Sequence, residues 1–370
     1  MKNRSLSFHY ILLAAAIGMS IAFSSCSDPL SGDATPRTKV ARLDAMMAMW
    51  EKDNAAMGAV AFTKGGKVLY QNYTGFARRS DNTVTKADST TIYQVASMTK
   101  MFTSVMIHQL IDEGRLQLST KLSEFYPQIK NAENITIRHL LEHRSGLHNW
   151  SIDADLASWS FSPQTREQML ARFATYTPEF TPDEKRYYSN TNYSLLGYII
   201  ETVTRSTYAE QLRMRIADRI GLKNTYDGTT TLPARPTEAQ SFTRNLLPAS
   251  WQLAPKTHIS TLLGTGSVFS TPVDICRFLE ALFAGQLTSQ QSLRSMITPN
   301  SEQKGDLGKG IDKETLFGGT LETHTKSARI DGFTGQAFYF PADSTACVVI
   351  LNGFTRTNIV FEPARLYYGK

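Results

Sequence analysis

β-rich runs lie near both ends of this 370-residue chain, and helical patterns fill the stretch between them. Near the start, AVAFT and VLYQN flank the glycine pair Gly65-Gly66, a spacing that predicts a β-hairpin. Near the end, FTGQAFYF and TACVVIL flank a short turn-forming stretch that begins at Pro341. We therefore predict an α/β (α+β) fold in which both chain ends build one antiparallel sheet, flanked by helices, with a helical subdomain inserted.

Apolar periodicity places the main helices. The stretch from Ser97 to Glu113 has an amphipathic pattern, and Gly114 follows it as a stop signal. Further helical patterns occupy residues 195–203 and 208–220 in the middle of the chain, and 272–283 before the last strands. The predicted helical subdomain and the flanking helices are inferred from these patterns.

The first residues are typical of an export signal. Two basic residues precede a 14-residue apolar stretch, Tyr10 to Phe23, which is too short to span a membrane. Small residues and then Cys26 follow, an arrangement that resembles a bacterial lipoprotein signal in which Cys26 becomes the acylated first residue. The alternative is an ordinary signal peptide cleaved near Ser25. We expect an exported protein, lipid-anchored to a bacterial membrane and facing the periplasm or the cell surface.

Charge and cysteine content exclude several classes of protein. The net charge is +6, but the Lys and Arg residues are scattered, so we expect no nucleic-acid partner. Three cysteines without a C-x-x-C pair provide neither a disulfide scaffold nor a zinc site. Cys276 and Cys347 lie in apolar runs and are interpreted as buried hydrophobic residues.

Ser97 and Lys100 form the first motif that could carry chemistry. Three residues apart at a helix start, they share one face, and the helix dipole there favours developing negative charge. An amine kept neutral by burial or by neighbouring cations can take the serine proton. The same spacing recurs at Ser301 and Lys304, but in a polar stretch typical of a loop. The strand-like TIYQVA before Ser97 favours the first copy.

Two further motifs follow along the chain. Tyr188 and Asn190 are two residues apart and point to one side of an extended segment. On a strand bordering a cleft, Lys326 and Ser327 can each donate to a carboxylate, while the Arg329 N–H faces the ligand. Taken alone, each motif has a simpler interpretation: a packed tyrosine, and a charged edge strand that discourages aggregation.

His139 and His143 match H-x-x-E-H, a zinc-peptidase pattern with two histidines on one helical face. No acidic residue occurs at a position that would supply a third ligand. We therefore expect no metal and no other cofactor.

Together and in this order, the motifs resemble the serine β-lactamase and penicillin-binding-protein superfamily, most closely its class C β-lactamase, DD-peptidase and family VIII esterase branch. The resemblance runs from about Ala59 to Leu351 and implies a β-lactamase/transpeptidase-like fold. Five blocks carry it: TIYQVASMTKMFTS, ITIRHLLEHRSGL, FTPDEKRYYSNTNYSLLGYIIE, GTGSVFSTPVDICRFLEAL and DLGKGI.

The resemblance also implies roles for the site residues. Where the third motif of this superfamily usually has glycine, this chain has Ala328, and we expect its methyl group to crowd a bulky substrate such as a β-lactam. The implied roles are nucleophile for Ser97, activating partner for Lys100, proton relay for Tyr188, ligand of the substrate amide for Asn190, third motif for Lys326 and Ser327, and oxyanion hole for the N–H groups of Ser97 and Arg329.

These roles imply an exported serine hydrolase that acts through an acyl-enzyme on Ser97. Its substrates would be D-amino-acid peptides, β-lactams or related amides and esters, and Lys326 with Ser327 favours one with a free carboxylate. Two alternatives stay open: a catalytically idle penicillin-binding or cell-wall-peptide-sensing module, suggested by Ala328, and a family VIII-type esterase. We expect a monomer. The predicted segments are a lipoprotein signal peptide (1–25), a tether (26–42) and a catalytic domain (43–370), the latter divided into a sheet region (43–114 and 255–370) and the helical subdomain (115–254).

Overall fold

The computed structural model describes residues 35–369 except 81, 231–234, 246–249 and 299–307. The predicted signal peptide and the lipidated Cys26 therefore lie outside the described residues. Helix α1 (Pro36–Lys52) begins inside the segment predicted as a tether (26–42), so this segment is helical from Pro36 onward. Thr35 caps this helix, because its hydroxyl accepts a hydrogen bond from the Thr38 N–H. Within the described part of the chain, no helix combines the length and apolarity needed to cross a bilayer.

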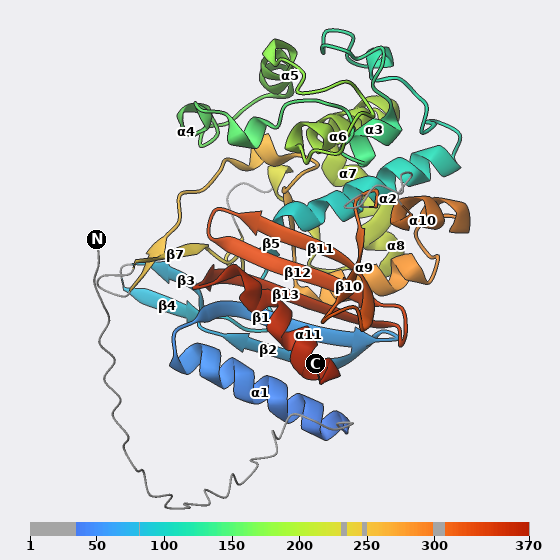
Figure 1. Ribbon diagram of the computed structural model, residues 1–370. Coiled ribbons are helices and arrows are strands. Elements are labelled where there is room, and N and C mark those ends of the chain that lie inside the picture. The colour runs from blue at the N-terminus through green and yellow to red at the C-terminus, as the bar shows by residue number, and fades with distance from the viewer. Residues whose placement is uncertain (1–34, 81, 231–234, 246–249, 299–307, 370) are drawn as a thin grey trace, which may run out of the picture.

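Both chain ends build one six-stranded antiparallel sheet, as predicted (Figure 1). The β1 strand pairs with the last strand, β13, so that Val60 lies opposite Val349. The glycine pair Gly65-Gly66 forms the turn of the predicted hairpin between β1 and β2, with both glycines at positive φ. In spatial order the strands are β10 (Asp312–Leu316), β11 (Leu321–Ile330), β12 (Phe333–Phe340), β13 (Thr345–Phe354), β1 (Ala56–Lys64) and β2 (Lys67–Thr74).

Helices cover both faces of this sheet, which explains why its central strands are apolar on both sides. Along β1, Ala59 and Ala61 belong to the core cluster that also contains the buried residues of α2 and α9. Val60 and Phe62 belong to the cluster shared with α1 and α11 on the opposite face. Figure 1 shows this layering. The helices are α2 (Thr99–Asp112), α9 (Pro272–Phe283), with the bounds predicted from the sequence, and α11 (Glu362–Tyr368).

The predicted helical subdomain is mostly helical but not purely so. The pattern predicted as one helix over 208–220 is interrupted by a π-helical turn, Arg213–Ala217. Short strands also occur there, since β6 and the β7–β8 hairpin lie between residues 115 and 254. Its main helices are α3 (Ile137–Leu141), α4 (Leu156–Trp159), α5 (Arg166–Thr175), α6 (Asn190–Thr204), α7 (Tyr208–Leu212) and α8 (Asp218–Ile220), and α10 (Gln290–Ile297) follows α9.

A small three-stranded sheet joins the helical region to the start of α2. Its order is β5-β9-β6, and all its pairs are antiparallel. The remaining strands form two hairpins beside the large sheet. The bounds are β3 (Phe76–Ser80), β4 (Thr83–Lys86), β5 (Tyr93–Gln94), β6 (Tyr226–Asp227), β7 (Phe242–Asn245), β8 (Ser250–Leu253) and β9 (Val268–Ser270).

Candidate active site

Ser97 lies in a short 3₁₀ helix, η1 (Ala96–Met98), directly before α2. The turn is held on both sides by β9, because Val95 N donates to Val268 O (2.9 Å) and Val268 N donates to Thr99 Oγ1 (3.1 Å). Ala96 has a φ of 45°, in the left-handed region that residues with a Cβ rarely adopt. Within this otherwise buried turn, the side chain of Ser97 remains partly exposed. The fold therefore presents the Ser97 hydroxyl on a strained turn that is hydrogen-bonded to β9.

The first two sequence motifs meet at Ser97 Oγ. The Tyr188 hydroxyl lies 3.0 Å from Ser97 Oγ, and Lys100 Nζ lies 3.2 Å from the same oxygen. Lys100 Nζ also donates to Asn190 Oδ1 (2.8 Å) and to Thr265 O (3.0 Å). Four residues predicted from the sequence, Ser97, Lys100, Tyr188 and Asn190, thus form one hydrogen-bonded network.

Burial separates the proton affinities of the two partners of Ser97. Lys100 is fully buried, and its desolvation, together with the nearby Lys326, holds the pKa of its amine well below the usual lysine value. Burial raises the pKa of Tyr188 to about 12, so that its phenol keeps its proton at neutral pH. Lys100 is therefore the base available to Ser97, whereas a Tyr188 phenolate is disfavoured.

The two other acceptors orient the Lys100 amine. A neutral amine has two N–H donors and one lone pair. Asn190 Oδ1 and Thr265 O are the nearer acceptors, at 2.8 and 3.0 Å, and they satisfy both N–H groups. In the neutral form of Lys100, the lone pair is then left for the Ser97 hydroxyl, whose Oγ lies 3.2 Å from Nζ, within the reach of a general base.

Both histidines of the H-x-x-E-H pattern have one ring nitrogen engaged by the surrounding protein. The His143 ring packs against the Tyr188 ring, with ring centres 4.4 Å apart. Its Nδ1 accepts from Ser189 N (3.2 Å), and burial holds its pKa well below the usual histidine value, so it stays a neutral acceptor. His139 Nδ1 accepts from Thr136 N (3.3 Å) at the start of α3. His143 therefore supports the tyrosine motif, a role that the sequence pattern did not suggest.

The third motif lies on β11 beside the nucleophile, as predicted. Lys326 and Ala328 are buried, whereas Ser327 and Arg329 on the alternate face are exposed. The neighbouring strand β10 pairs with residues 321–325 only, so 326–330 have no described strand beside them on that edge. η1 packs against β11 there. The oxyanion hole formed by the N–H groups of Ser97 and Arg329 stays a prediction, one that this packing favours.

Ala328 has less contact with the cleft than we expected. Its side chain is only 6% exposed and belongs to the main core cluster. It lies opposite Gly335 of β12 and has a small share of the cleft wall. Because most of the methyl group is covered by protein, little of it remains to crowd a substrate.

Sequence reasoning missed a partner of Lys326. Its ammonium forms a buried ion pair with Asp312 of β10, with Nζ 3.1 Å from Oδ2. Asp312 lies opposite Thr325 in the strand pairing, next to Lys326. No local motif marks this pair, because it depends on the register of two strands. Ser301, the other serine that precedes a lysine by three residues, lies outside the described residues.

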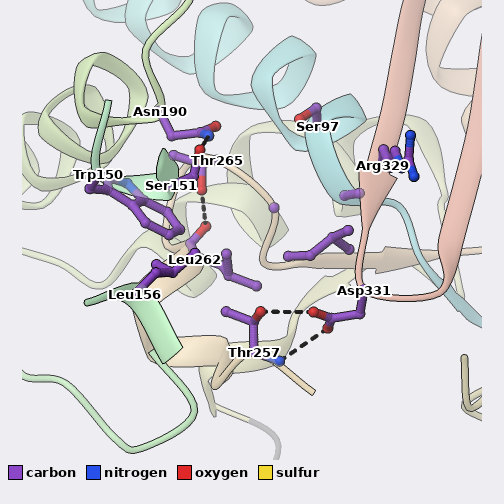
Figure 2. Close-up of a pocket in the computed structure, with 13 residues that line it drawn as sticks. Ser97, Trp150, Ser151, Leu156, Asn190, Thr257, Leu262, Thr265, Arg329 and Asp331 are labelled. Atoms are coloured by element: carbon purple, nitrogen blue, oxygen red, sulfur yellow. Dashed lines mark hydrogen bonds between the residues drawn. The ribbon is translucent and has the colours of Figure 1, made fainter. Parts of the chain in front are cut away.

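Two cavities lie next to Ser97, and together they are called the cleft here. The first, of about 260 Å³, is lined by Trp150, Leu156, Leu262 and also Asp331, which accepts two hydrogen bonds from Thr257 (Figure 2). The second, of about 600 Å³, extends along β10 and β11. Ser97, Asn190 and Arg329 line both cavities. The cleft therefore has room for groups on both sides of a carbonyl held at Ser97.

Comparison with known proteins agrees with this geometry. Residues 43–366 match the protein family Beta-lactamase. The chain belongs to this family. The fold and the superfamily predicted from the sequence are thereby confirmed.

Curated relatives and solved structures add detail to the family assignment. Penicillin-binding protein 4* of Bacillus subtilis is 26% identical over 290 residues, which cover 75% of this chain and 62% of that protein. The D-alanyl-D-alanine-carboxypeptidase/endopeptidase AmpH of Escherichia coli K12 is 26% identical, over 60% of this chain and 56% of AmpH. The chain thus spans less than two thirds of the length of these relatives.

Solved structures share the fold. D-amino acid amidase from Ochrobactrum anthropi, in complex with D-phenylalanine, superposes with a TM-score of 0.74 at 23% identity, covering 88% of this chain and 98% of the amidase. A penicillin-binding protein from Bacillus halodurans gives a TM-score of 0.74 at 22% identity, covering 87% and 98%. The helical insertion and the sheet of this chain therefore follow the architecture of these solved structures.

Proposed function

We propose that this member of the Beta-lactamase family is a serine hydrolase that forms an acyl-enzyme on Ser97. The observation that carries the proposal is the buried Lys100 amine, whose pKa is lowered by burial and by Lys326 and whose Nζ lies 3.2 Å from Ser97 Oγ. A serine hydroxyl needs such a base to become a nucleophile at neutral pH.

The reaction has two steps. Ser97 Oγ bonds to the substrate carbonyl carbon while its proton passes to Lys100, and the bond to the leaving group then breaks. Tyr188 stays protonated and lies 3.0 Å from Ser97 Oγ, so it can donate a proton to the departing amine or alkoxide and recover one from Lys100. Water then attacks the acyl group, giving its proton to the same network, and Ser97 is released.

We propose D-amino-acid peptides, amides or esters as the substrate class, with β-lactams as possible acylating agents. Three observations support this choice: the cleft extends on both sides of Ser97, a relative is named as a D-alanyl-D-alanine carboxypeptidase and endopeptidase, and a solved structure of the same fold is a D-amino acid amidase. Export and a lipid anchor at Cys26 are proposed from the leader sequence alone.

A serine-directed fluorophosphonate probe followed by peptide mapping tests the proposal. We expect one label, on Ser97, and none in Ser97→Ala, which changes the side chain little. Ser301→Ala, which removes the other serine with the same lysine spacing, is the matched control and should label fully. Labelling of the Ser97→Ala variant at another serine would refute the mechanism.

A turnover measurement separates a hydrolase from an idle receptor. A chromogenic ester and a fluorescent penicillin are incubated with the protein, and the labelled fraction is followed over time. We expect the ester to be hydrolysed with many turnovers. A permanent label without turnover would instead identify an acylable binding module.

A further inference from the structure

We infer that Asp312 is a specificity-determining residue, whose carboxylate takes the place beside Lys326 that a substrate carboxylate would occupy. The site then favours substrates with an uncharged group at this position. The inference rests on the proposed function and names the substrate class more closely. It also revises the sequence-based expectation of a substrate with a free carboxylate, which assumed an unpaired Lys326.

The ion pair between Lys326 and Asp312 is built into the sheet. The two charged atoms are 3.1 Å apart, and the side chains are 6% and 10% exposed. Within the described part of the chain, the structure gives Lys326 Nζ no other hydrogen-bond partner. The strand pairing fixes Asp312 opposite Thr325, so both members of the ion pair lie on paired strands and neither lies in a loop. A buried, hydrogen-bonded carboxylate of this kind competes directly with a carboxylate brought by a substrate.

The same wall of the cleft carries a second acid. Glu314 lies two residues along β10 from Asp312, is half-buried and lines the same cavity. Burial and, to a lesser extent, the neighbouring Asp312 raise its pKa, so two acids lie next to Lys326 at this wall. A third carboxylate at Lys326 would add to this repulsion.

The effect is local to Lys326. Arg186 and Arg329 also line the cavity, so the cleft as a whole is not closed to anions. A test must therefore change the charge at one position of the substrate and keep everything else the same.

Two activated aryl esters with one acyl group provide such a pair. In one ester the phenol leaving group carries a meta-carboxylate, and in the other a meta-carboxamide of similar size. The quantity to measure is the ratio of kcat/KM for the carboxylate ester to that for the carboxamide ester. We expect the wild-type protein to prefer the carboxamide ester, and Asp312→Asn to raise the ratio at least tenfold, because the Lys326 ammonium becomes free.

The ratio removes effects that act on both esters alike. Asp312→Asn also leaves Lys326 uncompensated near Lys100, which changes the activity of the base equally for the two substrates. Glu314→Gln is the matched control, because it removes one acid from the same wall without breaking the ion pair. We expect it to change the ratio less than threefold.

The possible outcomes are distinct. A wild-type preference for the carboxylate ester would overturn the inference without any variant, so the test does not depend on whether Asp312→Asn folds. An equal rise of the ratio in Asp312→Asn and Glu314→Gln would also overturn it, since general charge would then explain the effect. Hydrolysis of neither ester by a protein that no serine probe labels would overturn the proposed function itself, and the inference with it.

Discussion

A lysine acts as a base near neutral pH only where its ammonium form loses the stabilisation that water gives it. At Lys100 the side chain is fully buried, and a second ammonium, that of Lys326, lies near enough to disfavour another positive charge. Asp312 offsets part of the charge of Lys326 at 3.1 Å. Three residues on three elements therefore set the protonation state of one amine.

The pH dependence of acylation follows from this environment. Acylation needs unprotonated Lys100, so kcat/KM should fall as the pH decreases through the lowered pKa of this amine. The plateau should begin well below the usual lysine pKa of about 10.4. It should continue to about pH 10, because the pKa of Tyr188 is raised to about 12. A pH profile of ester hydrolysis checks this, and a plateau that begins only above pH 10 would show that the pKa of the base is not lowered by its environment.

Lys100 and Tyr188 should behave as one unit in proton transfer. Each of Lys100→Gln and Tyr188→Phe should lower kcat/KM on the order of 10²- to 10⁴-fold, since both contact Ser97 Oγ. The loss of kcat/KM in the double variant should be much smaller than the product of the two single losses. Both residues serve the same proton path, which either substitution alone already interrupts. Steady-state kinetics of the three variants measures this. An additive double variant, or a silent Tyr188→Phe, would contradict the relay.

The residues that sequence reasoning found are those joined by local geometry. Ser97 and Lys100 meet because they are three positions apart on a helical turn, which spacing alone reveals. Thr265 was missed as a site residue because it contributes a backbone carbonyl, which every residue has. Asp312 was missed because its contact with Lys326 depends on the register of β10 against β11.

At the level of elements, the same distinction holds. The β1–β2 hairpin and α9 were predicted because glycine turns and apolar periodicity mark them over many residues. β5 and β6 have two residues each, too few to show a period, yet their sheet with β9 positions the nucleophile turn. Short elements that owe their form to tertiary contacts leave almost no pattern in the sequence.

The position of Ala328 on β11 leads to a different prediction from the one that the sequence suggests. Its methyl group is packed in the core, so Ala328→Gly should change penicillin acylation and ester hydrolysis by the same factor. Glycine inside a strand should also lower the free energy of unfolding by roughly 0.5–1 kcal/mol. Acylation rates for the two substrates and urea unfolding measure both effects. A selective gain with penicillin would restore the view that Ala328 crowds the substrate.

At the scale of the whole molecule, the cleft lies where the helical region meets the large sheet, and a buried ion pair connects the two near the site. Lys309 precedes Asp312 of β10 by three residues, and Glu142 lies at the end of α3. Lys309 Nζ is 2.9 Å from Glu142 Oε1, and the two side chains are 1% and 3% exposed. The same ammonium donates to Ser295 O (3.0 Å) and Thr298 O (3.2 Å). This one buried cation therefore holds α3, α10 and the approach to β10 together.

Removing this cation should destabilise the protein strongly. Lys309→Met keeps the side-chain length but leaves the buried Glu142 carboxylate with Arg138 as its remaining ion-pair partner among the described residues. We expect a loss of up to about 3–5 kcal/mol in the free energy of unfolding, and a smaller loss when Glu142→Gln is added, because a buried carboxylate that has lost one of its two ion-pair partners is the main cost. Lys313→Met is the matched control: Lys313 also pairs with an acid, Glu322, at 2.8 Å, but both side chains are about half exposed, so its loss should stay below about 1 kcal/mol. Urea unfolding of the wild-type protein and the three variants measures these differences. Equal losses of stability in Lys309→Met and Lys313→Met would show that burial of the Lys309–Glu142 pair adds nothing to stability.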